Sequence, residues 1–95
     1  MTNHVEGKVI VITGAGSGFG RLVAERTAAM GAHVVGGDLS EEALAATTTG
    51  IRAAGGDATH LVADVTDKHQ MDALARHAVD THGRIDVLEI GRAHV

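Results

Sequence analysis

The sequence predicts an α/β fold: the amino-terminal half of a doubly wound parallel sheet with helices on both faces. Apolar, strand-like runs alternate with helix-like segments along the 95 residues, as in βαβ units. Glycines crowd the turn after the first run, and an aspartate closes each of the next two. Right-handed crossovers in the order β-α-β-α-β-α-β predict the spatial strand order 3-2-1-4, with the fourth strand cut short.

The first βαβ unit is expected within residues 8–38. Residues 8–13, Lys-Val-Ile-Val-Ile-Thr, are apolar without alternation, which is typical of a strand covered on both faces. A glycine-rich turn at 14–20 leads into a helix at 21–30. The second strand is expected at 33–38.

The rest of the chain predicts two further helices and two further strands. Ser40 is placed to cap a helix that ends near Gly55, and residues 60–65 read as the third strand. Thr66 or Asp67 caps the last helix, and residues 84–88 begin the fourth strand. The expected buried stripes are Leu44, Thr47, Thr48 and Ile51 in one helix and Met71, Leu74, Ala75, Ala78 and Val79 in the other.

Composition excludes several classes of protein. A chain of 95 residues makes one small domain at most. The net charge is −4 and the basic residues are scattered, so neither nucleic acid nor a membrane is an expected partner. There is no cysteine and no apolar run of about 20 residues. Residues 1–6 lack the pattern of a secretory signal, so the expected location is cytoplasmic.

No metal site is predicted from the seven histidines. His69, His77 and His82 share one expected helix, but their spacing does not place them on one face, so a solvated face is expected. The remaining histidines, His4, His33, His60 and His94, have no partner at ligand spacing.

The glycine-rich turn indicates a pyrophosphate-binding site. Glycines after a strand allow a tight reversal and let backbone N–H groups and a helix N-terminus approach an anion. The strict Gly-x-Gly-x-x-Gly fingerprint is not met, because Phe19 and Arg21 stand where a third glycine would fall. The residues from Thr13 to Gly20 fit Thr-Gly-x-x-x-Gly-x-Gly instead.

Residues 7–88 resemble the amino-terminal part of the short-chain dehydrogenase/reductase family. The resemblance rests on the loop at 13–20, on Asp64-Val65 and on the run Gly-Arg-Ile-Asp-Val-Leu at 83–88. It implies an NAD(P)-binding Rossmann fold and, in the intact protein, an oxidoreductase that interconverts a secondary alcohol and a ketone. The implied partners are NAD(H), a small-molecule substrate and other copies of the intact chain.

The expected cofactor-binding residues are Gly14, Gly16, Ser17, Gly18, Phe19, Gly20, Asp38, Leu39, Asp64 and Val65. Asp38 is placed to accept hydrogen bonds from the adenosine ribose. It would repel the 2′-phosphate of NADP by about 4 kcal/mol at 4 Å and an effective dielectric constant near 20, so NAD is the expected cofactor. Neither Ser17 nor Leu39 supplies a basic residue for that phosphate. The resemblance implies that Asp64 accepts from the adenine amino group and that Val65 packs near the ring.

Other interpretations of these residues stay open. Asp38 could instead serve the start of the next helix, and Asp64 could be an exposed acid at a strand end. The backbone N–H of Phe19 is expected to face the pyrophosphate while its ring packs. Arg21 could reach the phosphates or lie on a solvated helix face.

No catalytic residue is expected in this chain. The family's catalytic set includes a tyrosine and a lysine four residues later, together with a serine and an asparagine. The chain has no tyrosine, and its lysines are Lys8 and Lys68. It keeps the adenosine-pyrophosphate half of the cofactor site, so it should be inactive, a non-catalytic nucleotide-binding fragment. A half-domain of an S-adenosylmethionine-dependent methyltransferase is a more distant alternative. The glycine loops of those enzymes usually follow an acidic residue directly, whereas this chain has Ile12-Thr13 at that place.

Residues 89–95 are expected to be a non-native tail on a partial domain of residues 1–88. The resemblance implies Asn-Asn-Ala-Gly near this point, but the sequence reads Glu-Ile-Gly-Arg-Ala-His-Val. One set of codons that encodes those residues, GAG ATC GGA AGA GCA CAC GTC, matches a common sequencing-adapter oligonucleotide from its second base, so the tail is expected to be adapter read-through. Glu89 would also place a carboxylate inside a buried strand, which is costly.

Overall fold

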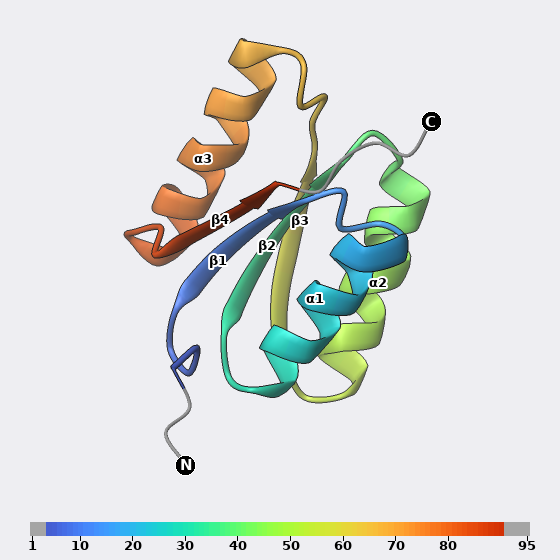
Figure 1. The fold of residues 1–95 in the computed structure, drawn as a ribbon, viewed down its shortest axis with the longest axis vertical. Helices are drawn as coiled ribbons and strands as arrows, with labels where there is room; N and C mark the ends of the chain where they lie inside the picture. The colour runs from blue at the N-terminus through green and yellow to red at the C-terminus, as the bar shows by residue number, and fades with distance from the viewer. Residues whose placement is uncertain (1–3, 91–95) are drawn as a thin grey trace.

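The computed structural model describes residues 4–90 and contains one four-stranded parallel sheet. The strand order is β3-β2-β1-β4, so the predicted topology is confirmed (Figure 1). The strands are β1 (Val9–Thr13), β2 (His33–Asp38), β3 (Asp57–Val62) and β4 (Val87–Ile90). The helices are α1 (Gly18–Ala29), α2 (Glu41–Ala53) and α3 (Lys68–His82).

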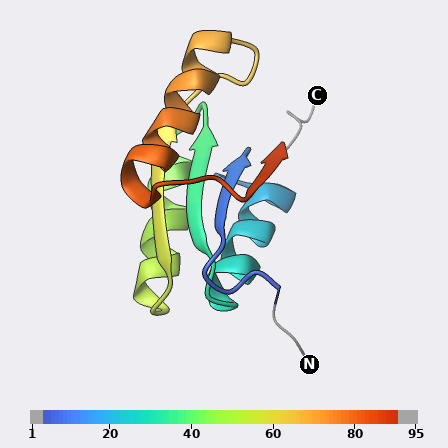
Figure 2. The same ribbon diagram turned by 90° about the vertical axis from the view of Figure 1, so that its left-hand side faces the viewer.

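Helices cover both faces of the sheet, with α1 and α2 on one face and α3 on the other (Figures 1 and 2). Every residue of β1 is buried. Ile10 and Ile12 pack with α1 and α2, whereas Val9 and Val11 pack with α3. This two-sided burial explains why the strand is apolar without alternation.

The helix ends follow the expected capping rules. The Ser40 hydroxyl accepts a hydrogen bond from the Ala43 backbone N–H at 3.1 Å, which caps α2. The Asp67 carboxylate caps α3 in the same way, and Gly83 follows α3 in the left-handed conformation. The predicted stripe of α2 is fully buried. That of α3 is buried at Leu74 and Ala78 only, because within residues 4–90 no second helix packs beside α3 on its face of the sheet.

Three elements start three residues away from their predicted starts. Helix α1 begins at residue 18 rather than 21, so the last glycines of the loop already form its first turn. Strand β3 covers 57–62 rather than 60–65, because it pairs with β2 from the first residue of β2 onward. Strand β4 covers 87–90 rather than 84–88, because residues 84–86 form the turn that reaches β1.

The fourth strand is exposed along its whole length, on the free side of β1. Glu89 and Ile90 belong to it, although the sequence predicts that they are part of the tail. The expectation that Glu89 would place a carboxylate in a buried strand is wrong for this chain, since Glu89 is exposed. Residues 91–95 of the expected tail lie outside the described residues. No helix in the described part of the chain is long and apolar enough to cross a membrane.

Candidate cofactor-binding cleft

A cleft of about 790 Å³ lies at the carboxyl ends of the strands. The chain winds from β1 to β3 on one side and then crosses to β4 on the other, so the loop after β1 occupies the point where the winding direction changes. Ligands of open α/β sheets bind at such a point.

The cleft contains nine of the ten expected cofactor-binding residues. They are Gly14, Ser17, Gly18, Phe19, Gly20, Asp38, Leu39, Asp64 and Val65. The structure adds four lining residues that the sequence analysis missed: Ala63, Thr66, Glu89 and Ile90. Ala63 and Thr66 flank the expected Asp64-Val65 pair, so widening the motif by one residue on each side would have found them. Glu89 and Ile90 enter because β4 ends beside β1, which only the strand order reveals.

Gly16, the tenth expected residue, does not line the cleft. Its N–H donates to the Asp38 carboxylate at 2.9 Å. A Cβ built at Gly16 would lie 2.7 Å from the Ala43 Cβ and 2.9 Å from Asp38 Oδ2. Gly16 therefore allows the loop to pack closely against α2 and β2, and it is buried there.

The glycine loop is shaped to present backbone rather than side chains. A Cβ at Gly20 would collide with the carbonyl oxygen of Gly14, so the first turn of α1 packs directly on the end of β1. Gly18 has a φ of +58°, and a Cβ built there meets no atom within 4 Å. Because Gly18 begins α1 and borders the cleft, the positive end of this helix opens onto a space that a phosphate group fits.

The Asp38 carboxylate connects the two strand ends that form one wall of the cleft. Its Oδ2 accepts the Gly16 N–H, and its Oδ1 accepts the Leu39 N–H at 2.7 Å. A third, longer bond of 3.4 Å comes from the Ser40 N–H. Ser40 is the residue that caps α2, so Asp38 orders the residues before the helix and does not itself cap it.

Asp64 is held as an ionised acceptor after β3. The hydroxyl and backbone N–H of Thr66 both donate to its Oδ1, at 2.7 and 2.8 Å. Both bonds lower the pKa of the Asp64 carboxyl below its ordinary value, and the bond from the hydroxyl has the larger effect. The expectation that the Phe19 ring packs is wrong for this chain, because Phe19 is 70% exposed at the start of α1. Phe19 and Leu39, which is 67% exposed, add apolar surface to the same cleft.

The other candidates have structural partners. Arg21 pairs with Glu25 at 3.2 Å on the exposed surface of α1, which fits the solvated interpretation. His77 and His82 are half-buried rather than fully solvated. The His77 ring lies 3.2 Å from the Thr59 hydroxyl.

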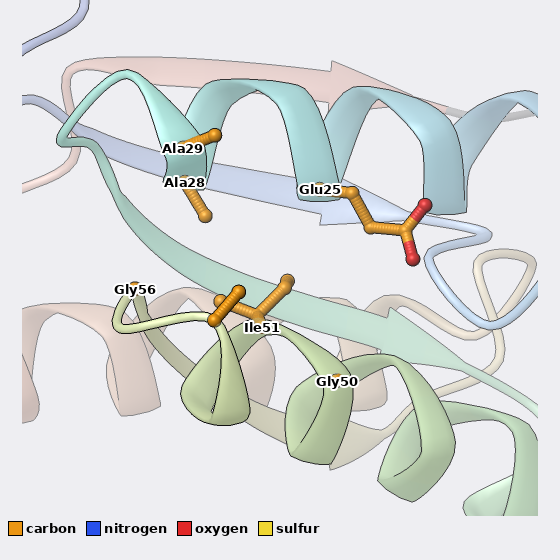
Figure 3. A pocket seen from close by; sticks show the side chains of 7 residues that line it. Glu25, Ala28, Ala29, Gly50, Ile51 and Gly56 are labelled. Carbon is orange, nitrogen blue, oxygen red and sulfur yellow. The ribbon is translucent and has the colours of Figure 1, made fainter.

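A smaller hollow of about 180 Å³ lies between α1 and α2 and shares no lining residue with the cleft (Figure 3). It is lined by small or apolar residues such as Ala28 and Ile51, and Glu25 is its one charged residue. It therefore lacks the converging polar groups of the larger cleft.

The family model described as short chain dehydrogenase matches residues 8–93. The chain belongs to the short chain dehydrogenase family. The match continues past residue 88, the expected end of the native segment. Membership of the short chain dehydrogenase family argues against the methyltransferase alternative.

Individual short chain dehydrogenases are also similar to this chain. A 2,5-dichloro-2,5-cyclohexadiene-1,4-diol dehydrogenase from Sphingobium indicum is 44% identical over 88 residues, which are 93% of this chain and 35% of the relative. A short chain dehydrogenase/reductase from Burkholderia phymatum, solved in complex with NAD, is 44% identical over 93% of this chain and 31% of that one, with a TM-score of 0.87. A hydroxysteroid dehydrogenase from Escherichia coli is 33% identical over 97% of this chain and 39% of that one, with a TM-score of 0.93. The chain spans about a third of the length of these relatives.

Proposed function

We propose that this chain is the dinucleotide-binding part of an NAD(H)-dependent oxidoreductase. The observation that carries the proposal is the Asp38 carboxylate, which stands at the end of β2, borders the cleft and is joined to the glycine loop. In its full length the protein interconverts a small secondary alcohol and a ketone, and it assembles with copies of itself.

Each part of the cleft has a proposed role. The loop at residues 14–20 and the start of α1 bind the pyrophosphate through backbone N–H groups. Asp38 accepts hydrogen bonds from the ribose hydroxyls, and the ionised Asp64 accepts from the adenine amino group. NAD(H) would supply the hydride chemistry when bound, and Phe19 and Leu39 would exclude water from the apolar parts of the ligand.

Asp38 is proposed to select NAD over NADP. Two of its backbone bonds hold the carboxylate at the cleft wall, so it cannot swing away from a 2′-phosphate without losing them. Repulsion of about 4 kcal/mol at 4 Å corresponds to a preference of roughly 100- to 1,000-fold once part of it is screened. The NAD in the Burkholderia phymatum structure, bound to a protein 44% identical to this chain, supports the same choice.

The 95-residue chain itself is proposed to bind nucleotide without turnover. Hydride transfer needs a general acid or base at the carbonyl or alcohol oxygen. The family's tyrosine and lysine pair cannot occur here, since the chain contains no tyrosine. The proposed native segment is residues 1–88, with 89–95 as a non-native tail.

Binding of adenosine-containing ligands tests the cofactor proposal. Calorimetric titration of the full chain should show binding of ADP-ribose and roughly 100- to 1,000-fold weaker binding of its 2′-phosphorylated form. In Asp38→Asn this ratio should fall toward one. The matched variant Asp64→Asn should weaken both ligands alike and leave the ratio unchanged. Equal affinities in the wild-type chain would refute the choice of NAD.

Genomic DNA across the codons for Leu88 and Glu89 tests the fragment proposal. A frame that continues into Asn-Asn-Ala-Gly and a later Tyr-x-x-x-Lys would support a longer enzyme and a non-native tail. A frame that encodes residues 89–95 and then stops would refute the proposal that the full protein is a dehydrogenase.

A further inference from the structure

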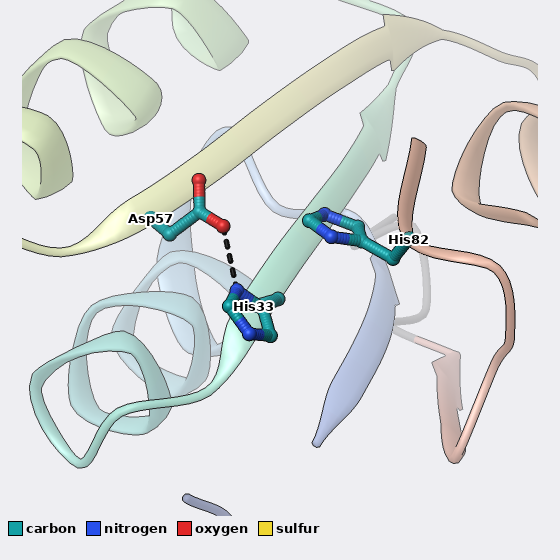
Figure 4. A group of neighbouring side chains, drawn as sticks. All are labelled: His33, Asp57 and His82. Carbon is teal, nitrogen blue, oxygen red and sulfur yellow. Dashed lines mark hydrogen bonds and ion pairs between the residues drawn. The ribbon is translucent and has the colours of Figure 1, made fainter. Parts of the chain in front are cut away.

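A second group of side chains that could bind a metal ion lies at the amino ends of the strands, whereas the cofactor cleft lies at their carboxyl ends. His33 is the first residue of β2, Asp57 is the first of β3, and His82 is the last of α3. Figure 4 shows the three side chains converging from these elements. Five residue steps along β2 separate His33 from Asp38, which is about 16 Å at 3.3 Å a step. The two sites are therefore separate.

The three side chains are already close together. His33 Nδ1 and Asp57 Oδ2 are 2.6 Å apart, and the His33 and His82 rings stack with their centroids 4.9 Å apart. One ligand atom from each residue can be chosen so that all three lie within 4.8 Å of one another. These residues are 24 and 25 positions apart in sequence, so parallel pairing of β2 with β3 and the return of α3 bring them together.

We propose that His33, Asp57 and His82 form a binding site for a divalent transition-metal ion such as Zn²⁺. Two imidazoles and one carboxylate are a donor set that suits this class of ion, with water completing a four-coordinate shell. The ion would take the place of the proton between His33 Nδ1 and Asp57 Oδ2. That proton moves to His33 Nε2 or to solvent.

Metal binding requires movement of these side chains. The His33 and His82 rings are stacked with an interplanar angle of 29°, and an imidazole nitrogen binds a metal in the plane of its ring, so one ring must rotate toward the ion. Bonds of about 2.0–2.1 Å place the ligands of a tetrahedral ion about 3.3 Å apart. The hydrogen-bonded His33 and Asp57 atoms must therefore open by about 0.7 Å, and the other pairs must close by up to about 1.5 Å. The His33 and Asp57 side chains are 40% and 54% exposed, so both have room to move.

The electrostatic surroundings favour a cation. His82 occupies the last turn of α3, where the helix dipole is negative and stabilises positive charge. Asp57 supplies a carboxylate, and the whole chain carries a net charge of −4. A bound ion would join the end of α3 to the first residues of β2 and β3, so its binding free energy would add to the stability of the fold.

Cobalt and zinc binding to the full chain test the proposal. The wild-type chain should bind one Co²⁺ with visible d–d absorption, and ZnCl₂ should displace it and raise the melting temperature measured by circular dichroism. Loss of a supporting partner weakens metal binding by roughly 10- to 100-fold, so loss of a ligand in His33→Gln, Asp57→Asn or His82→Gln should cost at least as much. His69→Gln removes an exposed imidazole from the start of α3 and should bind as the wild type does.

The wild-type chain alone also decides the question by ¹⁵N NMR of the imidazoles. Zinc should shift the nitrogens of two histidines, and the shifts should disappear on chelation. Co²⁺ binding that survives in His82→Gln would show that other histidines hold the ion and would overturn the proposal. A wild-type chain with no Zn²⁺-dependent change in melting temperature or imidazole shift would overturn it equally. Neither readout uses a nucleotide, so the result is independent of the cofactor proposal.

Discussion

The substitution Asp38→Asn separates the structural role of this carboxylate from its charge. Both oxygens of Asp38 accept backbone hydrogen bonds, Oδ2 from Gly16 and Oδ1 from Leu39. An asparagine has one carbonyl oxygen and one amide NH₂ group. It can therefore accept from only one of the two N–H donors, and the NH₂ group faces the other.

The expected cost follows from the surroundings of the two donors. Gly16 is buried, whereas Leu39 is 67% exposed, so the amide oxygen should turn to Gly16 and water should hydrate the Leu39 N–H. A hydrogen bond to a charged group contributes about 1.5–3 kcal/mol, and hydration of the freed donor reduces the loss to about 1–2 kcal/mol. Asp38→Ala also leaves the buried Gly16 N–H without its acceptor, which adds about 1–3 kcal/mol.

Urea denaturation followed by circular dichroism at pH 7 measures these differences. The expected order of stability is wild type, then Asp38→Asn, then Asp38→Ala, and each kcal/mol should lower the melting temperature by about 4–8 °C for a domain of this size. Asp72→Asn is the matched control, because Asp72 is 62% exposed and pairs with Lys68, one turn earlier in α3, at 3.3 Å. Its effect should stay within about 0.5 kcal/mol. Equal stability of the Asn and Ala variants would refute the reasoning.

Three further predictions concern stability of the same chain. A Cβ at Gly37 would lie 2.6 Å from a methyl of the fully buried Leu74, so Gly37→Ala should cost about 1–3 kcal/mol in the wild type. It should cost less in the Leu74→Ala background, and additive costs in this double-mutant cycle would contradict the predicted contact. Asp67→Ala removes the cap of α3 and should lower the free energy of unfolding, measured by urea denaturation, by about 1 kcal/mol. An unchanged urea midpoint would contradict this prediction. A hydrogen bond from the Val9 N–H, and after it one from Arg84, lowers the pKa of the Asp86 carboxyl in the folded chain. The ionised carboxylate should therefore stabilise the fold above the ordinary pKa near 3.8, and this stabilisation should be lost as the pH falls through the lower pKa of the folded state. The free energy of unfolding should therefore fall less steeply below about pH 4 in an Asp86→Asn variant than in the wild type. Identical pH dependence of the two chains in this range would refute the assignment.

Local sequence signals predicted the elements of this fold well. The unbroken apolar run before Thr13 indicated a central strand, and Ser40 marked the start of a helix that the structure confirms. The pair Thr66 and Asp67 marked the start of another, and the structure shows that Asp67 is the cap. These signals work because a strand covered on both faces and a helix cap each depend on a few adjacent residues.

Features set by pairing between distant segments were harder to predict. The start of β3 depends on its register against β2, and the His60–Val65 run alone does not contain that information. The cleft positions of Glu89 and Ile90 depend on β4 lying beside β1. His33 and Asp57 likewise meet only because β2 and β3 run in parallel from those residues.

The glycine loop is fixed from two sides before any nucleotide binds. Asp38 accepts the Gly16 N–H, and the Thr47 hydroxyl of α2 donates to the Ala15 carbonyl oxygen at 3.0 Å. A preorganised loop loses little conformational entropy when an anion arrives. Association should thus resemble docking to a rigid surface, with a rate set by diffusion and charge rather than by loop rearrangement. An exchange of cofactor preference engineered at Asp38 would have to restore this rigidity as well as change the charge.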